Sequence, residues 1–203
     1  MKAFEEIIKK AEAGDAKALG MVGEAYLRGN DGMPQDYEQC FSYSIKAVES
    51  GNVRACTIIG ILYMEGLYFE KDMKKAILWF HRASEGGDSK APRCLGQLYE
   101  NGDGVLQDYS MAAKWYQKAA ERDDISGKYF LGKLYEKGLG VEQDYKKAME
   151  LYLSSGERGD NIAAPAIEAI AELYRQGLGV EKDEDKAQEW QQKYEKAKSV
   201  RLN

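Results

Sequence analysis

Proline, cysteine and histidine are scarce in this chain of 203 residues, and each shortage excludes a class of protein. Three prolines beside 21 glycines suit many helix ends and turns, and they argue against polyproline segments or flexible linkers. The three cysteines, Cys40, Cys56 and Cys94, are an odd number and include no CxxC pair. They therefore favour neither a disulfide framework nor a zinc site, and we expect three reduced thiols buried on helices.

Long hydrophobic runs and a basic charge balance are also lacking. The N-terminal segment "MKAFEEIIKKAEAGD" places acidic residues inside its apolar pattern, which predicts neither a signal peptide nor a membrane span. The net charge is −5 with both signs interspersed, so the field would repel a nucleic acid. We expect a cytoplasmic protein with no nucleic-acid or membrane partner.

The residues needed for catalysis are few. An enzyme requires a nucleophile with a base, a metal-ligand set or paired acids in one cleft. His81 is the single histidine and follows Trp79 by two residues, so we interpret it as a partly exposed helix residue rather than a general base. No G-x-S-x-G, H-E-x-x-H, G-x-x-x-x-G-K or S-x-x-K string occurs. The sequence predicts no catalytic residue, no metal and no cofactor, and hence a protein that is not an enzyme.

A repeat of about 36 residues is what the chain does contain. A tyrosine recurs at spacings of 37, 36, 36 and 39 residues, in the column Tyr26, Tyr63, Tyr99, Tyr135 and Tyr174. Three residues earlier stands a small residue, in the column Gly23, Gly60, Gly96, Gly132 and Ala171. An acidic column follows at Asp36, Asp72, Asp108, Asp144 and Asp183. Five units are therefore present.

Each unit predicts a helical hairpin. Apolar residues lie three and four apart in "AKALGMVGEAYLRG" and in "DYKKAMELY", which is helical spacing. The glycine column would let a neighbouring helix approach closely, with the tyrosine ring alongside. In "LYEKGLGVEQDYKKA" the first glycine can end the first helix, the second allows a tight reversal, and Asp144 can cap the second helix.

The loop of repeat 2 and the start of repeat 5 depart from this pattern. Repeat 2 has Tyr68 in place of the second loop glycine, so that loop must adopt another backbone or hold Tyr68 with strain. Repeat 5 has three extra residues within "GDNIAAPAIEAIAELY", where we expect a longer turn or a helix that begins at Pro165.

The quoted columns resemble the Sel-1-like repeat, a member of the tetratricopeptide-like superfamily. The match rests on "AKALGMVGEAY", "NGDGVLQDYSMAAKWY" and "KGLGVEQDYKKA" and covers nearly the whole chain. The resemblance implies an all-α, right-handed α/α superhelix, a solenoid of five antiparallel helix pairs. It also points towards bacterial signalling, secretion or stress adaptors and eukaryotic quality-control scaffolds.

A hairpin that cannot cover its own apolar face must stack on the next, so we expect one solenoid domain over residues 1–203. A partial N-terminal capping helix occupies 1–13, and the repeats span about 14–50, 51–86, 87–122, 123–158 and 159–203. The last helix is polar, with Gln191 where Phe80, Tyr116 and Tyr152 stand in other repeats.

Partner binding is assigned to the first helices of the hairpins, which line the concave groove in tetratricopeptide relatives. By register this face includes Lys17, Gly20, Glu24, Leu27, Lys90, Glu100, Ser126 and Glu136, and its chemistry differs in every repeat. The residues predicted to bind a partner are Arg54, Thr57, Ile61, Met64, Tyr68, Arg93, Gln97, Tyr129 and Lys133.

These observations favour a non-enzymatic scaffold or adaptor that binds a peptide or a helix of another protein, and we expect it to be a monomer. A first alternative is the β-lactam binding or hydrolysis linked with cysteine-rich members of the family. The regularly paired helix cysteines of those members are missing here. A second alternative is a structural spacer or self-associating subunit.

Overall fold

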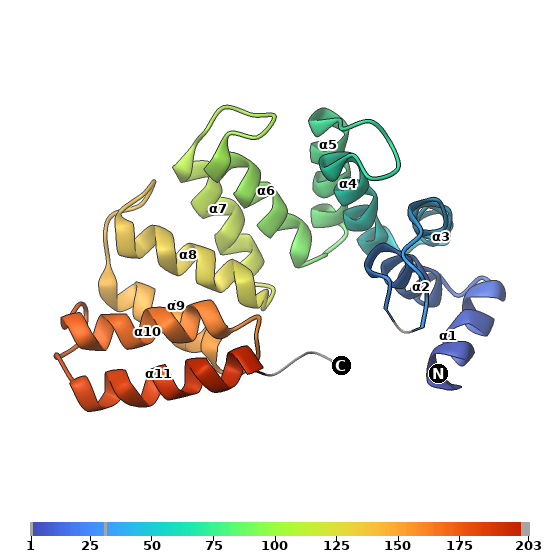
Figure 1. Ribbon diagram of the computed structural model, residues 1–203. Helices are drawn as coiled ribbons and strands as arrows, with labels where there is room; N and C mark the ends of the chain where they lie inside the picture. The colour runs from blue at the N-terminus through green and yellow to red at the C-terminus, as the bar shows by residue number, and fades with distance from the viewer. Residues whose placement is uncertain (1, 31, 200–203) are drawn as a thin grey trace. The chain divides into compact units, whose positions relative to one another are not determined.

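The chain is all-α in the computed structural model, which describes residues 2–30 and 32–199. Over these residues there are eleven α-helices and one 3-10 helix (Figure 1), which are α1 (Lys2–Glu12), α2 (Ala16–Arg28), α3 (Tyr37–Glu49), η1 (Val53–Ala55), α4 (Cys56–Glu65), α5 (Met73–Glu85), α6 (Lys90–Asn101), α7 (Tyr109–Ala120), α8 (Ile125–Lys137), α9 (Tyr145–Gly156), α10 (Ala164–Gln176) and α11 (Glu184–Ser199). The predicted all-α class is confirmed. Residue 1 of the predicted cap and residues 200–203 of the last repeat lie outside the described residues.

The acidic column begins the second helix of each repeat, as predicted. The carboxylate of Asp144 accepts a hydrogen bond from the backbone N–H of Lys147 at 3.0 Å, which satisfies one donor that the first turn of α9 would leave unpaired. The same bond, at 2.9 or 3.0 Å, starts α3, α5, α7 and α11 at Asp36, Asp72, Asp108 and Asp183. These caps fix where each second helix begins.

The two loop glycines of repeat 4 have different roles. Gly138 ends α8 in the left-handed region, with φ of 65°, and its N–H donates to the carbonyl of Leu134. Gly140 also has a positive φ, of 71°, and it lies directly against the backbone of Tyr109 and Ser110 in the preceding repeat. The Ser110 hydroxyl donates to the Gly140 carbonyl at 3.1 Å. The second glycine thus serves the contact between repeats as well as the turn.

The loop of repeat 2 takes the other backbone that the sequence analysis allowed. Among the described residues that are not glycine, positive φ occurs at Asp123 alone, so Tyr68 lies in an ordinary region. Its ring stacks on Phe41 of α3, with centroids 5.6 Å apart. An aromatic contact to the preceding repeat therefore stands where Gly140 makes a backbone contact in repeat 4.

The glycine column does admit a close neighbour, but the ring beside it differs from the expected one. A Cβ atom at Gly96 would lie 2.5 Å from the ring of Tyr116, and one at Gly132 would lie 2.7 Å from that of Tyr152. The expectation that the tyrosine of the first helix fills this space was wrong. The ring comes from the second helix of the same hairpin, because the missing side chain faces that helix.

Within each of the two compact units that the chain forms, apolar contacts join one hairpin to the next, as the stacking prediction requires. Tyr116 and Ala112 of α7 pack with Leu131 and Leu134 of α8. Tyr152 and Met149 of α9 pack in the same way with Ile170 of α10. In the N-terminal part, Cys40 of α3 packs with Ile58 and Leu62 of α4. The second helix of one repeat and the first helix of the next therefore share one core.

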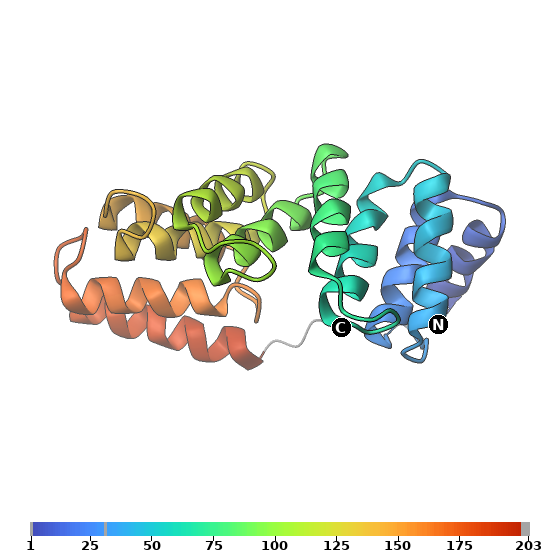
Figure 2. The same cartoon turned by 90° about the horizontal axis from the view of Figure 1, so that it is seen from above.

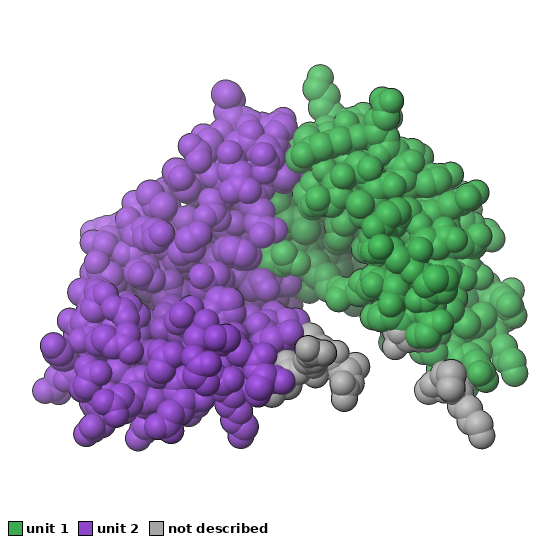
Figure 3. Space-filling view, in the orientation of Figure 1, with its two compact units in different colours: residues 1–95 green, residues 96–203 purple. Residues whose placement is uncertain are grey.

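The chain divides into two compact units, residues 1–95 and 96–203, with the boundary inside α6 (Figure 3). The first unit contains the packed pairs α2 with α3 and α4 with α5. The second contains α8 with α9 and α10 with α11, and the last pair lies side by side in both ribbon views (Figures 1 and 2). Each unit is a run of helical hairpins.

The irregular fifth repeat has the longer turn that was predicted, and its first helix begins at Ala164, one residue before Pro165. The longer turn precedes α10, and Pro165 lies in the first turn of that helix. Asp160 organises the turn, because its carboxylate accepts hydrogen bonds from the backbone N–H groups of Ile162 at 3.0 Å and Ala163 at 3.2 Å. Proline suits this place because the first turn leaves its N–H groups unbonded in any case.

The cysteines are free and buried, as expected. Burial raises the pKa of the Cys40 thiol to about 12. His81 lies half-buried on α5, in agreement with its interpretation as a partly exposed helix residue. A search of the described helices finds none that combines the length and apolarity needed to cross a membrane.

Candidate binding faces on the first helices

The predicted site residues fall on both compact units, and each unit is described by itself. The N-terminal face comprises Lys17, Glu24, Arg28, Arg54, Ile61, Met64, Lys90 and Arg93 of the unit 1–95. The C-terminal face comprises Gln97, Glu100, Tyr129, Lys133, Glu136 and Glu168 of the unit 96–203. All of these residues lie on, or directly before, the first helices of the hairpins.

The N-terminal face presents basic and apolar groups. Arg54 is exposed on η1, and Ile61 and Met64 are half-buried on α4. Arg93 is half-buried on α6. Guanidinium groups can hold carboxylates of a partner, and apolar side chains such as Ile61 and Met64 can accept an apolar residue.

Thr57 has a role inside the fold. Its side chain is buried, with 4% of the residue exposed, and its hydroxyl donates to the Asp88 carboxylate at 2.8 Å. The same oxygen of Asp88 accepts the backbone N–H of Ala91 at 2.7 Å and so caps α6. Thr57 therefore ties α4 to the start of α6, whereas the other predicted residues of this unit keep exposed surface.

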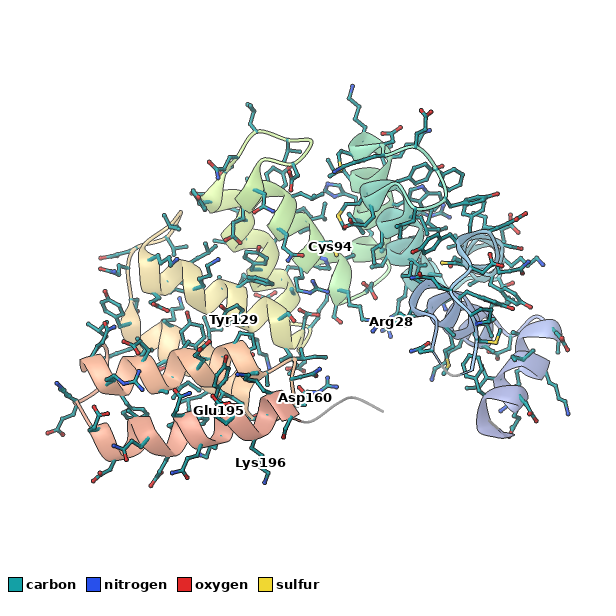
Figure 4. The ribbon with its side chains drawn as sticks, in the orientation of Figure 1. Arg28, Cys94, Tyr129, Asp160, Glu195 and Lys196 are labelled. Carbon is teal, nitrogen blue, oxygen red and sulfur yellow. The ribbon has the colours of Figure 1, made fainter. Side chains whose placement is uncertain are left out.

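One carboxylate lies among the cations of the N-terminal face. Glu24 forms ion pairs with Lys90 at 2.9 Å and with Arg28, labelled in Figure 4, at 2.8 Å. Burial opposes the charge of Glu24, but the two cations outweigh burial and hold the pKa of this carboxyl below its ordinary value. The pair with Lys90 joins α2 to α6 across 66 positions of sequence.

Tyr68 lies in a separate aromatic cluster. Besides stacking on Phe41, its ring meets that of Phe69 edge-on, with centroids 4.7 Å apart. Phe69 in turn stacks on Tyr63 at 4.4 Å. Tyr68 remains 43% exposed, so it offers an aromatic surface beside the loop between α4 and α5.

The C-terminal face centres on two carboxylates that buried tyrosines hold in place. The Tyr116 hydroxyl donates to Glu100 at 2.6 Å, and the Tyr152 hydroxyl donates to Glu136 at 2.5 Å. Both tyrosines are at most 1% exposed. Lys133 adds an ion pair with Glu100 at 3.2 Å. In each hairpin, the tyrosine of the second helix thus holds the carboxylate of the first helix. Hydrogen bonds to charged groups are stronger than those between neutral groups.

Tyr129, labelled on α8 in Figure 4, lies among these charges. Its ring centroid is 5.8 Å from that of Tyr152 and 5.3 Å from that of Phe130. Burial raises the pKa of Tyr129, the ammonium of Lys133 lowers it, and the carboxylates of Glu136, Glu168 and Glu100 raise it. Three carboxylates and one ammonium are therefore close enough to influence this hydroxyl.

Sequence reasoning placed Glu100 and Glu136 on the face but did not select them as site residues, and it did not consider Glu168. A signal for the first two was present, because repeats 3 and 4 carry glutamate on the first helix together with tyrosine on the second. Repeat 2 carries Met64 together with Phe80 at the same positions. Glu168 was missed because the three extra residues of repeat 5 obscure its register.

The buried Tyr152 hydroxyl leads to a prediction about alkaline pH. Burial and the bond to Glu136 raise the pKa of Tyr152 above its ordinary value of 10.0, so the unfolded chain loses this proton first. The stabilisation is complete below pH 10 and is lost as the pH rises above it. Between pH 10 and 11, the free energy of unfolding should fall more steeply in the wild type than in Tyr152→Phe, by about 1 kcal/mol per pH unit.

Denaturant titrations followed by circular dichroism at several pH values would measure this difference. The remaining tyrosines and lysines titrate in both proteins, so their effects cancel in the comparison. Equal slopes would show that Tyr152 ionises as easily in the folded chain as in the unfolded one.

No group of three or more His, Cys, Asp or Glu side chains is placed to hold a metal ion in the part of the chain that the structure describes. What the two faces offer is hydrogen-bonding, ionic and aromatic contact.

Comparison with known proteins identifies the repeat. A family model described as Sel1 repeat matches five segments, residues 16–52, 53–88, 95–124, 125–160 and 164–193. The first, second and fourth segments begin and end two residues after the repeats predicted from the sequence, whereas the third begins eight residues later and the fifth covers 164–193 in place of 159–203. No curated protein matches the chain.

Solved structures of bacterial proteins are similar. A protective antigen of uropathogenic Escherichia coli with an SLR fold is 32% identical at a TM-score of 0.78, and the match covers 95% of this chain but 40% of the antigen. A Sel1 repeat protein from Oxalobacter formigenes is 30% identical at a TM-score of 0.79, over 90% of this chain and 73% of that one. An immunity protein from Pseudomonas aeruginosa, 19% identical, shares the fold at a TM-score of 0.68, over 97% and 74%.

Proposed function

Since this chain belongs to the Sel1 repeat family, we propose that it is a non-enzymatic interaction module that binds a peptide or a helix of a partner protein through its first helices. The partner contacts are made by the side chains of the N-terminal and C-terminal faces. Helical repeats of this kind present rows of side chains from successive first helices to a ligand.

The observation that carries this proposal is the contrast between repeat positions that keep the same residue type and repeat positions that change. The capping aspartates, the loop glycines and the small residues of the first helices recur from repeat to repeat, since each has a structural task. At the face positions, by contrast, Ile61 is followed by Gln97 and Lys133, and Arg93 by Tyr129. Apart from Thr57, the predicted binding residues also keep exposed surface. Variable chemistry on a uniform scaffold is what recognition of a specific ligand requires.

Two of the similar proteins have roles that are compatible with binding. One is a protective antigen and another is an immunity protein, although the latter is similar in fold alone. The chain spans 40% of the length of the antigen. A role like that of the whole antigen is therefore a proposal for this chain.

The test is affinity capture with a variant of the N-terminal face. The triple variant Arg54→Ala, Met64→Ala and Arg93→Ala removes two guanidinium groups and one flexible apolar side chain from η1, α4 and α6. We expect it to recover at least tenfold less of the partner that the wild type captures from the native lysate, as quantified by mass spectrometry. Loss of contacts at the centre of an interface has effects of this size.

A matched control changes the same kinds of side chain on another helix. Lys74→Ala, Leu78→Ala and Arg82→Ala remove two cations and one apolar side chain from α5, where all three are exposed. This variant should retain the partner. If both triple variants kept their helical spectrum and both recovered the partner in full, the N-terminal face would not be the binding surface.

A further inference from the structure

The C-terminal face has a charge and a geometry that fit one kind of ligand group. The carboxylate of Glu136 is fixed by the hydroxyl of Tyr152, which donates to one of its two oxygens. A carboxylate accepts several hydrogen bonds, so the second oxygen can accept one from a ligand. Because the tyrosine is buried and donates to this carboxylate, Glu136 is held in position before any ligand arrives, which reduces the entropy lost on binding.

An aromatic surface lies beside this carboxylate. Tyr129 is half-buried on α8, and its ring is held by the neighbouring rings of Phe130 and Tyr152. The face of a tyrosine ring attracts a guanidinium or an ammonium group placed within about 6 Å of its centroid. The chain uses this contact repeatedly, for example where the Lys147 ammonium lies 4.4 Å from the ring centroid of Tyr135.

The charges around Tyr129 do not balance. Lys133 is engaged with Glu100 in an ion pair, and these two charges cancel. Glu136 and Glu168 then remain as an excess of two negative charges. The side chain of Glu168 is exposed on α10. Carboxylates close to an aromatic ring attract a cation and repel an anion, and both of these are close enough to influence the Tyr129 hydroxyl.

From this arrangement we propose that the C-terminal face receives an arginine or lysine side chain from a basic segment of the partner, stacked on Tyr129 and paired with Glu136 and Glu168. The proposal rests on the interaction function above and names the chemistry of the segment that this unit recognises. Arginine is the better fit, because its planar guanidinium can stack on the ring while its edge meets a carboxylate.

A peptide titration with the full chain tests the proposal. The probe is a fluorescein-labelled octapeptide of alternating arginine and alanine, and its counterpart has alternating glutamate and alanine. In anisotropy titrations at low salt, we expect the arginine peptide to bind at least tenfold more tightly than the glutamate peptide. Equal affinities, or tighter binding of the glutamate peptide, would overturn the proposal.

Two charge-reversal variants separate a specific contact from the general attraction of an acidic protein. Glu168→Lys changes the C-terminal face, whereas Glu150→Lys makes the same change at an exposed position on α9 of the same unit. The arginine peptide should bind Glu168→Lys about tenfold more weakly and Glu150→Lys within twofold of the wild type. An equal effect of both variants would mean non-specific charge attraction and would overturn the proposal.

The ring is tested by Tyr129→Leu, which keeps an apolar side chain and removes the aromatic face. We expect about threefold weaker binding of the arginine peptide, and full affinity in a variant with an unchanged helical spectrum would contradict the stacked geometry. Failure of the whole proposal is distinguishable from failure of the proposed function. If the arginine peptide did not bind while the N-terminal triple variant still lost its partner, the cation site would be wrong and the interaction function would stand.

Discussion

Replacing Gly140 with alanine is expected to lower the free energy of unfolding by about 2 to 5 kcal/mol, which is the sum of a conformational cost and a steric cost. The first is conformational, because Gly140 has φ of 71°, a region in which an alanine is strained by about 1 to 2 kcal/mol. The second is steric. The new Cβ atom would overlap the backbone of Tyr109 and Ser110, and backbone atoms at the start of a capped helix cannot move aside as a flexible side chain can.

Gly159→Ala is the matched control for this prediction. Gly159 lies in the same unit with a similar φ of 67°, but a Cβ atom there meets nothing within 4 Å. It should therefore cost only the strain, about 1 to 2 kcal/mol. Urea titrations of both variants, followed by circular dichroism, give the difference directly. Equal losses in the two variants would mean that the loop of repeat 4 moves away from α7 without cost, and that the contact between the repeats is not tight.

Tyr152→Ala is expected to cost about 4 to 5 kcal/mol, because it empties a fully buried aromatic site. The ring is 1% exposed, lies in the core between α9 and α10, and donates its hydroxyl to Glu136. The large cost reflects both the lost contacts and the cavity that remains, since the surrounding helices relax only in part.

The same ring determines whether a second substitution, Gly132→Ala, raises or lowers the free energy of unfolding. In the wild type, Gly132→Ala should destabilise the chain, because its Cβ atom would lie 2.7 Å from the Tyr152 ring. Overpacking of this kind costs about 1 to 3 kcal/mol, which exceeds the gain of about 1 kcal/mol from replacing glycine within a helix. In the Tyr152→Ala background the steric cost disappears and the helical gain remains. Gly132→Ala should then stabilise the chain.

A double-mutant cycle of these variants, measured as free energies of unfolding in urea, gives the coupling between the two positions. A control is Gly159→Ala in both backgrounds, where no change of sign is expected because that glycine contacts no ring. If Gly132→Ala had the same effect with and without the Tyr152 ring, the close approach of that ring would not be the reason that position 132 requires glycine.

The hairpins themselves could be predicted because their signals are local. Asp144 caps the helix that begins at the next residue, and Gly138 ends the helix that precedes it, so both act within a few positions of sequence. Repetition of these signals five times also fixed the register of the repeats, and it is the basis of the resemblance to the Sel-1-like repeat. The buried state of the three cysteines followed from the same helical pattern.

Contacts between helices were harder to predict. The sequence predicted that the tyrosine ring of the same helix would lie alongside Gly132, whereas the ring that a Cβ atom there would meet is that of Tyr152, 20 positions later. The sequence likewise predicted that Thr57 lies on the surface. In the structure Thr57 is buried, and its hydroxyl donates to Asp88. A periodic pattern predicts which side of a helix is apolar. It does not predict which side chain of a neighbouring helix packs against that side.

The sequence by itself determined the number of hairpins, the ends of their helices and the variable face of the first helices, because each depends on neighbouring residues or on repetition. Only the tertiary structure decided which side chains of the fold meet the charged groups of that face. Glu24 is paired with Lys90, Glu100 with Lys133, and Glu136 is held by Tyr152. These partners lie 66, 33 and 16 positions apart, so they meet through the packing of helices and not through local pattern.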